Sequence, residues 1–159
     1  MNPHEIEAVV DQRLRVLNVI CAALVFSVMV YVAIAWFLVQ RGSVQPSEGL
    51  PQVFPVILVL VALSVVMAAP VVSTMILKQG VAAAGEDAGR RLNSHQTSLI
   101  VGFALREVAA VMGLVLTLLS GRLIWVVALA AVAVAAMLLA WPKREKMLEL
   151  ARSGPGAIG

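Results

Sequence analysis

Residues 99 to 119 read LIVGFALREVAAVMGLVLTLL, and the charged side chains in this run are the adjacent Arg106 and Glu107. As a helix rising about 1.5 Å per residue, the run is long enough to cross the roughly 30 Å hydrocarbon core of a bilayer. A charge near the centre of such a helix costs about 2.5 to 3.5 kcal/mol on insertion scales, so it normally faces protein or water and often has a function. The run therefore predicts a transmembrane helix whose candidate functional residues are Arg106 and Glu107.

The composition of the whole chain is that of a membrane protein. Of its 159 residues, 61% are apolar and 13% are charged, and the mean hydropathy is +0.96. Four apolar stretches are each long enough to span a bilayer, at about residues 16–39, 53–77, 99–119 and 123–141. Because little of the chain remains, we expect a single integral membrane domain over residues 1–159, folded as an all-α, four-helix transmembrane bundle with no soluble catalytic domain.

The basic residues predict the orientation, because Lys and Arg that flank spans are retained on the cytoplasmic side. They gather before the first span, between the second and third spans, and after the fourth: Arg13, Arg15, Lys78, Arg90, Arg91, Lys143, Arg144, Lys146 and Arg152. The other two connections carry Arg41 and Arg122. Both termini are therefore expected in the cytoplasm, with the bacterial inner membrane as the setting. The net charge of +3 then reflects this orientation, and no nucleic-acid partner is expected.

Several other classes of protein are disfavoured. An A-x-A pattern at residues 33 to 35 follows an apolar run, as in a secretory signal peptide, but the run is longer than a signal core and acids precede it. Cys21 is the single cysteine, and the two histidines lie outside the spans without cysteines or carboxylates at ligand spacing. We therefore expect an uncleaved first span and no disulfide, metal, cofactor or enzyme active site.

Small residues predict where helices pack, since they let helix backbones approach closely in a membrane. Three of them lie along one side of the third span: Gly102, Ala109 and Gly113. The fourth span has alanines at three- and four-residue spacing: Ala128, Ala131 and Ala135. We expect a tight contact between these two helices, and the short connection at residues 120 to 122 makes them antiparallel neighbours.

The charged pair needs partners on other helices. Adjacent helical residues point about 100° apart, so Arg106 and Glu107 cannot neutralise each other well. Polar residues in the first and second spans are predicted to form an intramembrane cluster with Arg106: Asn18, Ser73 and Thr74. Arg106 should lean toward the N-terminal end of its helix. Tyr31, in contrast, is interpreted as an aromatic anchor near the outer membrane surface.

Residues 99 to 116 resemble the carboxylate-bearing helix of the rotary ATPase proteolipids. The shared features are the small residues, the Ala-Leu-x-Glu sequence that ends at Glu107, and a Gly-Leu-Val sequence from Gly113. The four-span size is also similar to that of the double-hairpin proteolipids of V-type enzymes, although those carry the glutamate on the fourth helix. In that family the glutamate binds the transported proton or sodium ion, so the resemblance implies this role for Glu107.

Two functions are therefore predicted. The first is a small, non-catalytic integral membrane protein that packs with copies of itself or with other membrane subunits, as a homo-oligomer or as an accessory subunit of a complex. In this case Arg106 and Glu107 hold helices or subunits in register. The alternative is a proteolipid-like proton or cation carrier that uses Glu107. A small-molecule transporter is less favoured, because the two halves of the chain show no internal duplication.

Overall fold

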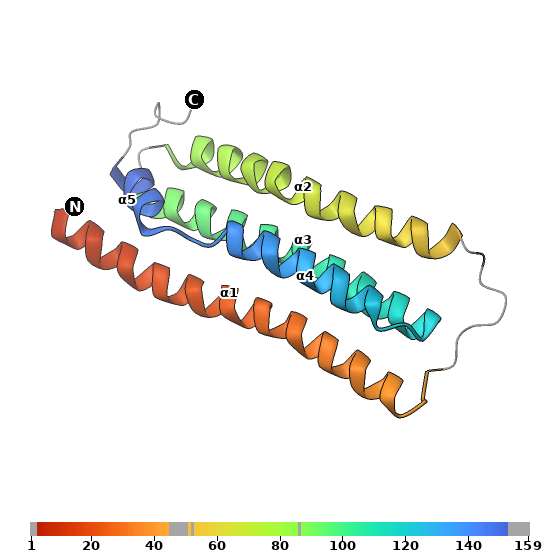
Figure 1. Cartoon of the computed structure of the whole chain (residues 1–159). Coiled ribbons are helices and arrows are strands. Elements are labelled where there is room, and N and C mark those ends of the chain that lie inside the picture. The colour runs from red at the N-terminus through yellow and green to blue at the C-terminus, as the bar shows by residue number, and fades with distance from the viewer. Residues whose placement is uncertain (1–2, 45–50, 52, 86, 153–159) are drawn as a thin grey trace.

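The computed structural model of the chain describes residues 3–44, 51, 53–85 and 87–152. All the regular elements in these residues are helices: α1 (Pro3–Gln40), α2 (Val53–Ala84), α3 (Ala88–Ser120), α4 (Ile124–Leu139) and α5 (Arg144–Arg152). Figure 1 shows α1 to α4 lying lengthwise beside one another, with the short α5 at one end. The all-α prediction is therefore confirmed for the described part of the chain.

Three helices are long and apolar enough to cross a membrane, namely α1, α2 and α3. They have 38, 32 and 33 residues and extend beyond the apolar stretches in the sequence. As a result, α2 and α3 are separated by residues 85 to 87 alone. The fourth helix is shorter. With 16 residues, α4 is about 24 Å long, which is shorter than a bilayer core of roughly 30 Å. The apolar stretch at residues 123–141 reaches that length only when the residues that flank α4 are included.

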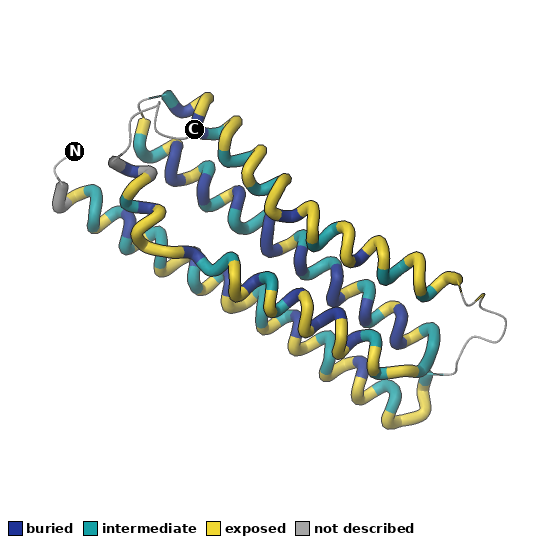
Figure 2. Tube along the Cα trace, turned by 45° about the horizontal axis from the view of Figure 1, so that its top comes forward, coloured by how far each residue is buried: buried dark blue, intermediate teal, exposed yellow. Residues whose placement is uncertain are grey.

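The central helix of the fold is α3. It contacts α1, α2, α4 and α5, whereas α1 and α2 do not contact each other in the described residues. Figure 1 shows α3 and α4 between the two outer helices, and Figure 2 shows buried positions concentrated along α3 and exposed positions along α2. α1, α2 and α4 therefore surround α3 on part of its circumference and leave one side of it open, between α1 and α2.

One narrow seam attaches α1 to the rest of the fold. Its buried and half-buried residues alternate at spacings of three and four: Val10, Leu14, Leu17, Cys21, Leu24, Val28, Tyr31 and Ala35. An average spacing of 3.5 residues is the repeat of a coiled coil, and it keeps the seam facing α3 and α4 along the whole helix. Other positions of α1 expose large apolar side chains, such as Phe26.

A tight turn joins α3 to α4. Gly121 ends α3 with a φ of 68°, a left-handed conformation that glycine adopts readily, and its N–H donates to the Thr117 carbonyl at 2.8 Å. The Thr117 hydroxyl oxygen in turn accepts the Val126 N–H at 3.1 Å, which satisfies a backbone donor in the first turn of α4. The two helices are antiparallel neighbours, as the length of the connection predicts.

The face of α4 that packs inward differs from the predicted one. Its buried residues are Val126, Leu129, Ala130, Ala133 and Met137. The three alanines expected to contact α3 are exposed: Ala128, Ala131 and Ala135. Because α4 is apolar on every side, the spacing of its alanines cannot show which side faces protein. The larger residues of the buried face fill the space against α3 instead.

A short amphipathic helix closes one end of the fold. Met147 and Ala151 on α5 are buried. On its other side Arg144 donates from Nε to Asp11 Oδ1 at 2.7 Å and from Nη2 to Oδ2 at 3.3 Å, so the guanidinium holds the carboxylate of α1 in two places. Both side chains are about half exposed. The start of α1 and the end of the described chain are thereby fastened together.

The ion pair between Asp11 and Arg144 gives a pH-dependent prediction. Both residues lie outside the apolar stretches, and the hydrogen bond from Arg144 lowers the pKa of Asp11 below its usual value. A lowered carboxyl pKa in the folded state stabilises that state above the unfolded pKa of about 3.9, and this stabilisation is lost as the pH falls through the folded pKa. We expect the thermal midpoint in detergent to fall slightly from pH 6 to pH 3, and to fall less in Arg144→Gln. Arg122→Gln, an exposed change in the α3–α4 connection, is the control and should behave like the unmodified chain. Equal pH dependence in Arg144→Gln would count against a stabilising ion pair between Asp11 and Arg144, which we call the clasp.

Candidate functional site

Glu107, near the middle of α3, is hydrogen-bonded to the second half of α1. Its Oε1 accepts from the Ser27 hydroxyl at 2.5 Å and from the Tyr31 hydroxyl at 2.7 Å. Ser27 and Tyr31 are four residues apart, so they lie one turn from each other on the same face of α1. One carboxylate oxygen thus gathers two hydroxyls from a neighbouring helix. We call these three residues the carboxylate clamp.

The sequence prediction did not include the two hydroxyl partners of the clamp. The aromatic ring of Tyr31 and its place in the outer half of the span predict a surface anchor. In the structure it is half-buried, and its hydroxyl points at Glu107. A usable signal was present, because Ser27 and Tyr31 share one helix face with the apolar seam of α1. A polar pair on a buried face of a membrane helix needs a polar partner on the next helix.

Arg106 points to a different neighbour from Glu107. It is 8% exposed, and its Nε is buried without a hydrogen-bond partner among the described residues. Its Nη1 lies over Gly102, one turn toward the start of α3, where an added methyl group would come within 3.1 Å of it. The side chain therefore leans toward the N-terminal end of the helix, as expected. No ion pair links Arg106 to Glu107 in the described structure.

The structure brings together only part of the predicted polar cluster. Ser73 of α2 contacts the same Gly102 position as Arg106, and its hydroxyl oxygen is buried without a described partner. Thr74, the next residue, is exposed and donates to the Pro70 carbonyl of its own helix at 2.7 Å. Asn18 is half-buried with an unpartnered Oδ1. Hydrogen bonds among the described residues join neither Thr74 nor Asn18 to Arg106.

The three small residues of α3 serve two different neighbours. All three are buried. At Gly102 the neighbour is α2, through Ser73. At Gly113 it is α4, and an added methyl group there would lie 3.0 Å from the Trp125 carbonyl oxygen and 3.0 Å from the Val126 Cα. These small residues form one stripe in the sequence, but two helices pack against it: α2 packs against the start of the stripe and α4 packs against its end.

The chemistry open to the clamp is that of oxygen groups, namely hydrogen bonding and the binding of a proton or a hard cation. No group of three His, Cys, Asp or Glu residues gathers within the described part of the chain. The clamp itself offers one carboxylate and two hydroxyl groups, all of them oxygen. Its second carboxylate oxygen, Oε2, takes part in no hydrogen bond among the described residues.

Comparisons with protein-family models, with curated proteins and with solved structures found no match to the chain. The resemblance of residues 99 to 116 to the rotary ATPase proteolipids therefore stays an interpretation of that sequence.

Proposed function

We propose that the chain is a small, non-catalytic integral membrane protein that works by helix packing, as a homo-oligomer or as an accessory subunit of a membrane complex. It crosses the bilayer four times with both termini in the cytoplasm, and its setting is the bacterial inner membrane. The length of α1 to α3 and the distribution of basic residues support this topology. So does the clasp between Asp11 and Arg144, which brings the N-terminal and C-terminal segments to one side.

The observation that carries this proposal is the carboxylate clamp. Glu107 accepts two hydrogen bonds from α1, so its carboxylate links α3 to α1. Without these bonds, apolar residues would provide nearly all of the α1 seam in the middle of the membrane. Such a seam fixes the sliding register of two helices less well than a directional polar contact does.

Broad apolar faces leave room for further packing partners. On α2 the exposed large side chains include Leu60, Met67, Val71 and Met75, and on α1 they include Val19 and Phe26. In a bilayer these faces meet lipid tails or the helices of another subunit. An accessory subunit needs faces of this kind, because its own core occupies only one side of each outer helix.

Native mass spectrometry of the protein extracted in mild detergent tests the proposal. We expect either a fixed small number of identical copies or a fixed stoichiometry with unrelated membrane subunits. A chain that is recovered only as a monomer, with nothing bound under the mildest extraction, would contradict a function through packing. A closed ring of many identical copies would favour the alternative below.

The alternative function is that of a proton or cation carrier using Glu107, and one detail of the clamp favours it. The Ser27 hydroxyl lies within hydrogen-bond distance of two acceptors, Glu107 Oε1 and the Leu24 carbonyl oxygen at 2.7 Å. It has a single proton. When Glu107 is ionised, Ser27 can donate to it. When Glu107 carries a proton on Oε1, the Ser27 hydroxyl oxygen can accept a hydrogen bond from that O–H and donate its own proton to the Leu24 carbonyl. The clamp can therefore satisfy both protonation states without moving a helix.

A hydrophobic carbodiimide tests this alternative, since it modifies protonated carboxyl groups within membranes. If Glu107 exchanges a proton with the medium, the extent of modification should rise as the pH falls, and Glu107→Gln should abolish it. Glu145→Gln, an exposed change on α5, is the matched control and should leave the modification unchanged. Modification that is independent of pH, or that survives Glu107→Gln, would exclude Glu107 as the carrier residue.

A further inference from the structure

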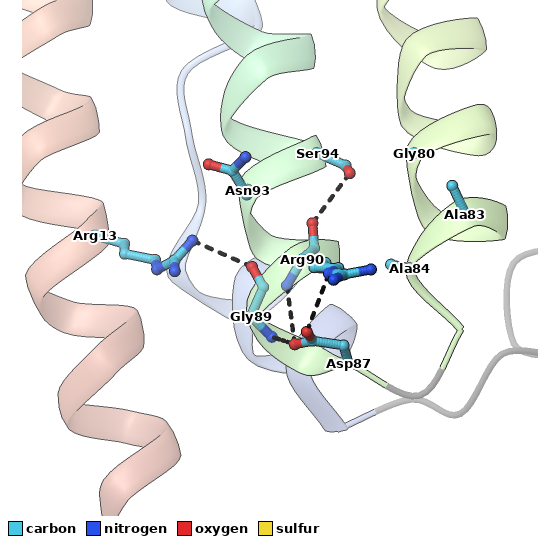
Figure 3. Close-up of a pocket in the computed structure, with 9 residues that line it drawn as sticks. All are labelled: Arg13, Gly80, Ala83, Ala84, Asp87, Gly89, Arg90, Asn93 and Ser94. Atoms are coloured by element: carbon cyan, nitrogen blue, oxygen red, sulfur yellow. Dashed lines mark hydrogen bonds and ion pairs between the residues drawn. The ribbon is translucent and has the colours of Figure 1, made fainter.

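A hollow of about 530 Å³ lies at the start of α3, where α1 and α2 flank it on either side. Figure 3 shows Arg13 reaching toward α3 from α1 on one side, and the end of α2 on the other. Its volume is in the range of about 300 to 1,000 Å³ typical of small-molecule sites. The residues that line it are Arg13, Gly80, Ala83, Ala84, Asp87, Gly89, Arg90, Asn93 and Ser94.

Two arginines make the hollow electropositive. The Arg13 guanidinium donates from Nη1 to the Gly89 carbonyl at 3.3 Å, which holds it across the gap between α1 and α3. The Arg90 side chain is 73% exposed, and its Nε lies 3.4 Å from Asp87. With one aspartate among the described lining residues, the lining carries a net charge of about +1. Asp87 already accepts the N–H groups of Gly89 and Arg90, so these two backbone amides at the start of α3 are not available to a ligand.

The hollow continues into the open side of α3. Gln96 contacts α1 through Arg13, and Ser94 contacts α2 at Gly80. At about 100° per residue, Thr97 is turned about 100° from Gln96 and about 60° from Ser94, so it faces the space between the two outer helices. Thr97 is exposed, and the exposed positions beyond it along α3 are apolar: Ala104, Val111, Val115 and Leu118. The open side is therefore polar and basic at one end and apolar along the rest.

We propose that this hollow and the apolar face beyond it bind one phospholipid with an anionic headgroup. Arg13 and Arg90 hold the phosphate, the Asn93 amide donates a hydrogen bond, and an acyl chain lies along α3 toward Ala104. The 99–119 stretch places the edge of the hydrocarbon core near Leu99, about 9 Å along the helix from Asn93, so a headgroup held at Asn93 lies outside the core and its acyl chain enters the core beside α3. Basic pockets between transmembrane helices on the cytoplasmic side are recurrent sites for such headgroups.

This inference rests on the proposal that α1, α2 and α3 cross a membrane, with the start of α3 on the cytoplasmic side.

A second hollow at the same end of the molecule provides a control site for the lipid-binding test. It has a volume of about 340 Å³ and lies between α3, α4 and α5. Its charged lining residues are Lys143, Lys146, Glu145 and Glu149, whose charges cancel. Removing its two lysines takes away the same charge as removing the two arginines, at the same end of the protein.

The test is lipid retention measured by native mass spectrometry. The full chain, stripped of lipid in detergent, is incubated with equal amounts of phosphatidylglycerol and phosphatidylcholine, and the retained lipids are counted. We expect the unmodified protein to prefer phosphatidylglycerol, and each arginine removed to lower its retention about fivefold. The variants are Arg90→Gln and the double variant Arg13→Gln/Arg90→Gln. The matched control is Lys143→Gln/Lys146→Gln, which should retain phosphatidylglycerol normally.

Arg90→Gln alone keeps the test decisive if the double variant does not fold, because Arg90 is largely exposed and its replacement leaves the contacts of Arg13 intact. Equal retention of the two lipids by the unmodified protein would overturn the proposal, as would an equal loss in the lysine control. Displacement of the lipid by millimolar inorganic phosphate would show that the site takes a free anion instead. A chain that fails to insert into vesicles would contradict the membrane topology itself, whereas insertion without a lipid preference would contradict only this site.

Discussion

Replacing Gly113 with leucine is expected to separate α3 from α4 and to cost about 3 kcal/mol or more, at the upper end of the usual effect of overpacking. A Cβ atom at this position would lie 3.0 Å from the Trp125 carbonyl oxygen, 3.0 Å from the Val126 Cα and 3.1 Å from the Leu129 Cβ. Two of these three atoms belong to the backbone of α4, so no side-chain rotation can relieve the contact. The helix itself has to move.

The movement would also disturb the turn between the two helices. The Thr117 hydroxyl that accepts the Val126 N–H lies one turn beyond Gly113. A displaced α4 would therefore lose this bond as well as its apolar packing. In a thermal unfolding experiment in detergent, about 3 kcal/mol corresponds to a fall in the midpoint of roughly 6 to 12 °C for a chain of this size.

The matched control for Gly113→Leu is Ala131→Leu on the exposed side of α4. It adds a side chain of the same kind in the same helix pair, and we expect it to change the thermal midpoint little. If Ala131→Leu were as damaging as Gly113→Leu, the buried face of α4 would be wrongly assigned. An unaffected Gly113→Leu protein would remove the basis for a function through close helix packing.

Replacing Glu107 with alanine is the second change with a large expected effect. It would leave the Ser27 and Tyr31 hydroxyls without their shared acceptor, between two helices in an apolar surrounding. Interhelical hydrogen bonds in membranes contribute about 0.6 kcal/mol each on average and up to about 1.7, so the loss of two should cost roughly 1 to 3 kcal/mol. Glu107→Gln keeps a carbonyl oxygen in place of Oε1, and its effect should be smaller.

A double-mutant cycle separates the clamp from a general effect of the substitution. Tyr31→Phe removes one hydroxyl and should cost about 1 kcal/mol in the unmodified background, but much less when Glu107 is already alanine. Thermal or denaturant unfolding of the four proteins measures the difference. Additive losses would show that Tyr31 and Glu107 do not interact. Glu145→Ala on α5 is the control for removing a carboxylate, and it should leave the midpoint unchanged.

The sequence predicts the helices well because hydropathy measures the property that separates lipid-facing segments from the others. Hydropathy does not report where a helix ends once it leaves the lipid, and for this reason α2 and α3 continue well beyond residues 77 and 99 toward each other. The inward lean of Arg106 is also predictable, because it follows from the direction of side chains along any helix. These features depend on one helix at a time.

The features that the sequence does not predict depend on how helices are rotated against each other. The clamp requires Ser27 and Tyr31 of α1 to face Glu107 of α3 across a gap of some 80 residues in the chain. The buried face of α4 depends on packing among residues that are all apolar. Composition and spacing contain little information on such rotations, because lipid and protein neighbours accept the same side chains.

The central place of α3 has a consequence for how the chain is assembled. Synthesis from the N-terminus delivers α1 and α2 first, and these two helices have no contact with each other in the described fold. In the proposed topology, each stays a separate helix in the lipid until α3 is inserted between them, closely followed by α4 through the short turn at Gly121. A chain interrupted before residue 88 would hold two helices that do not pack against each other, so nascent fragments of this protein should be open to removal by membrane proteases until the third helix arrives.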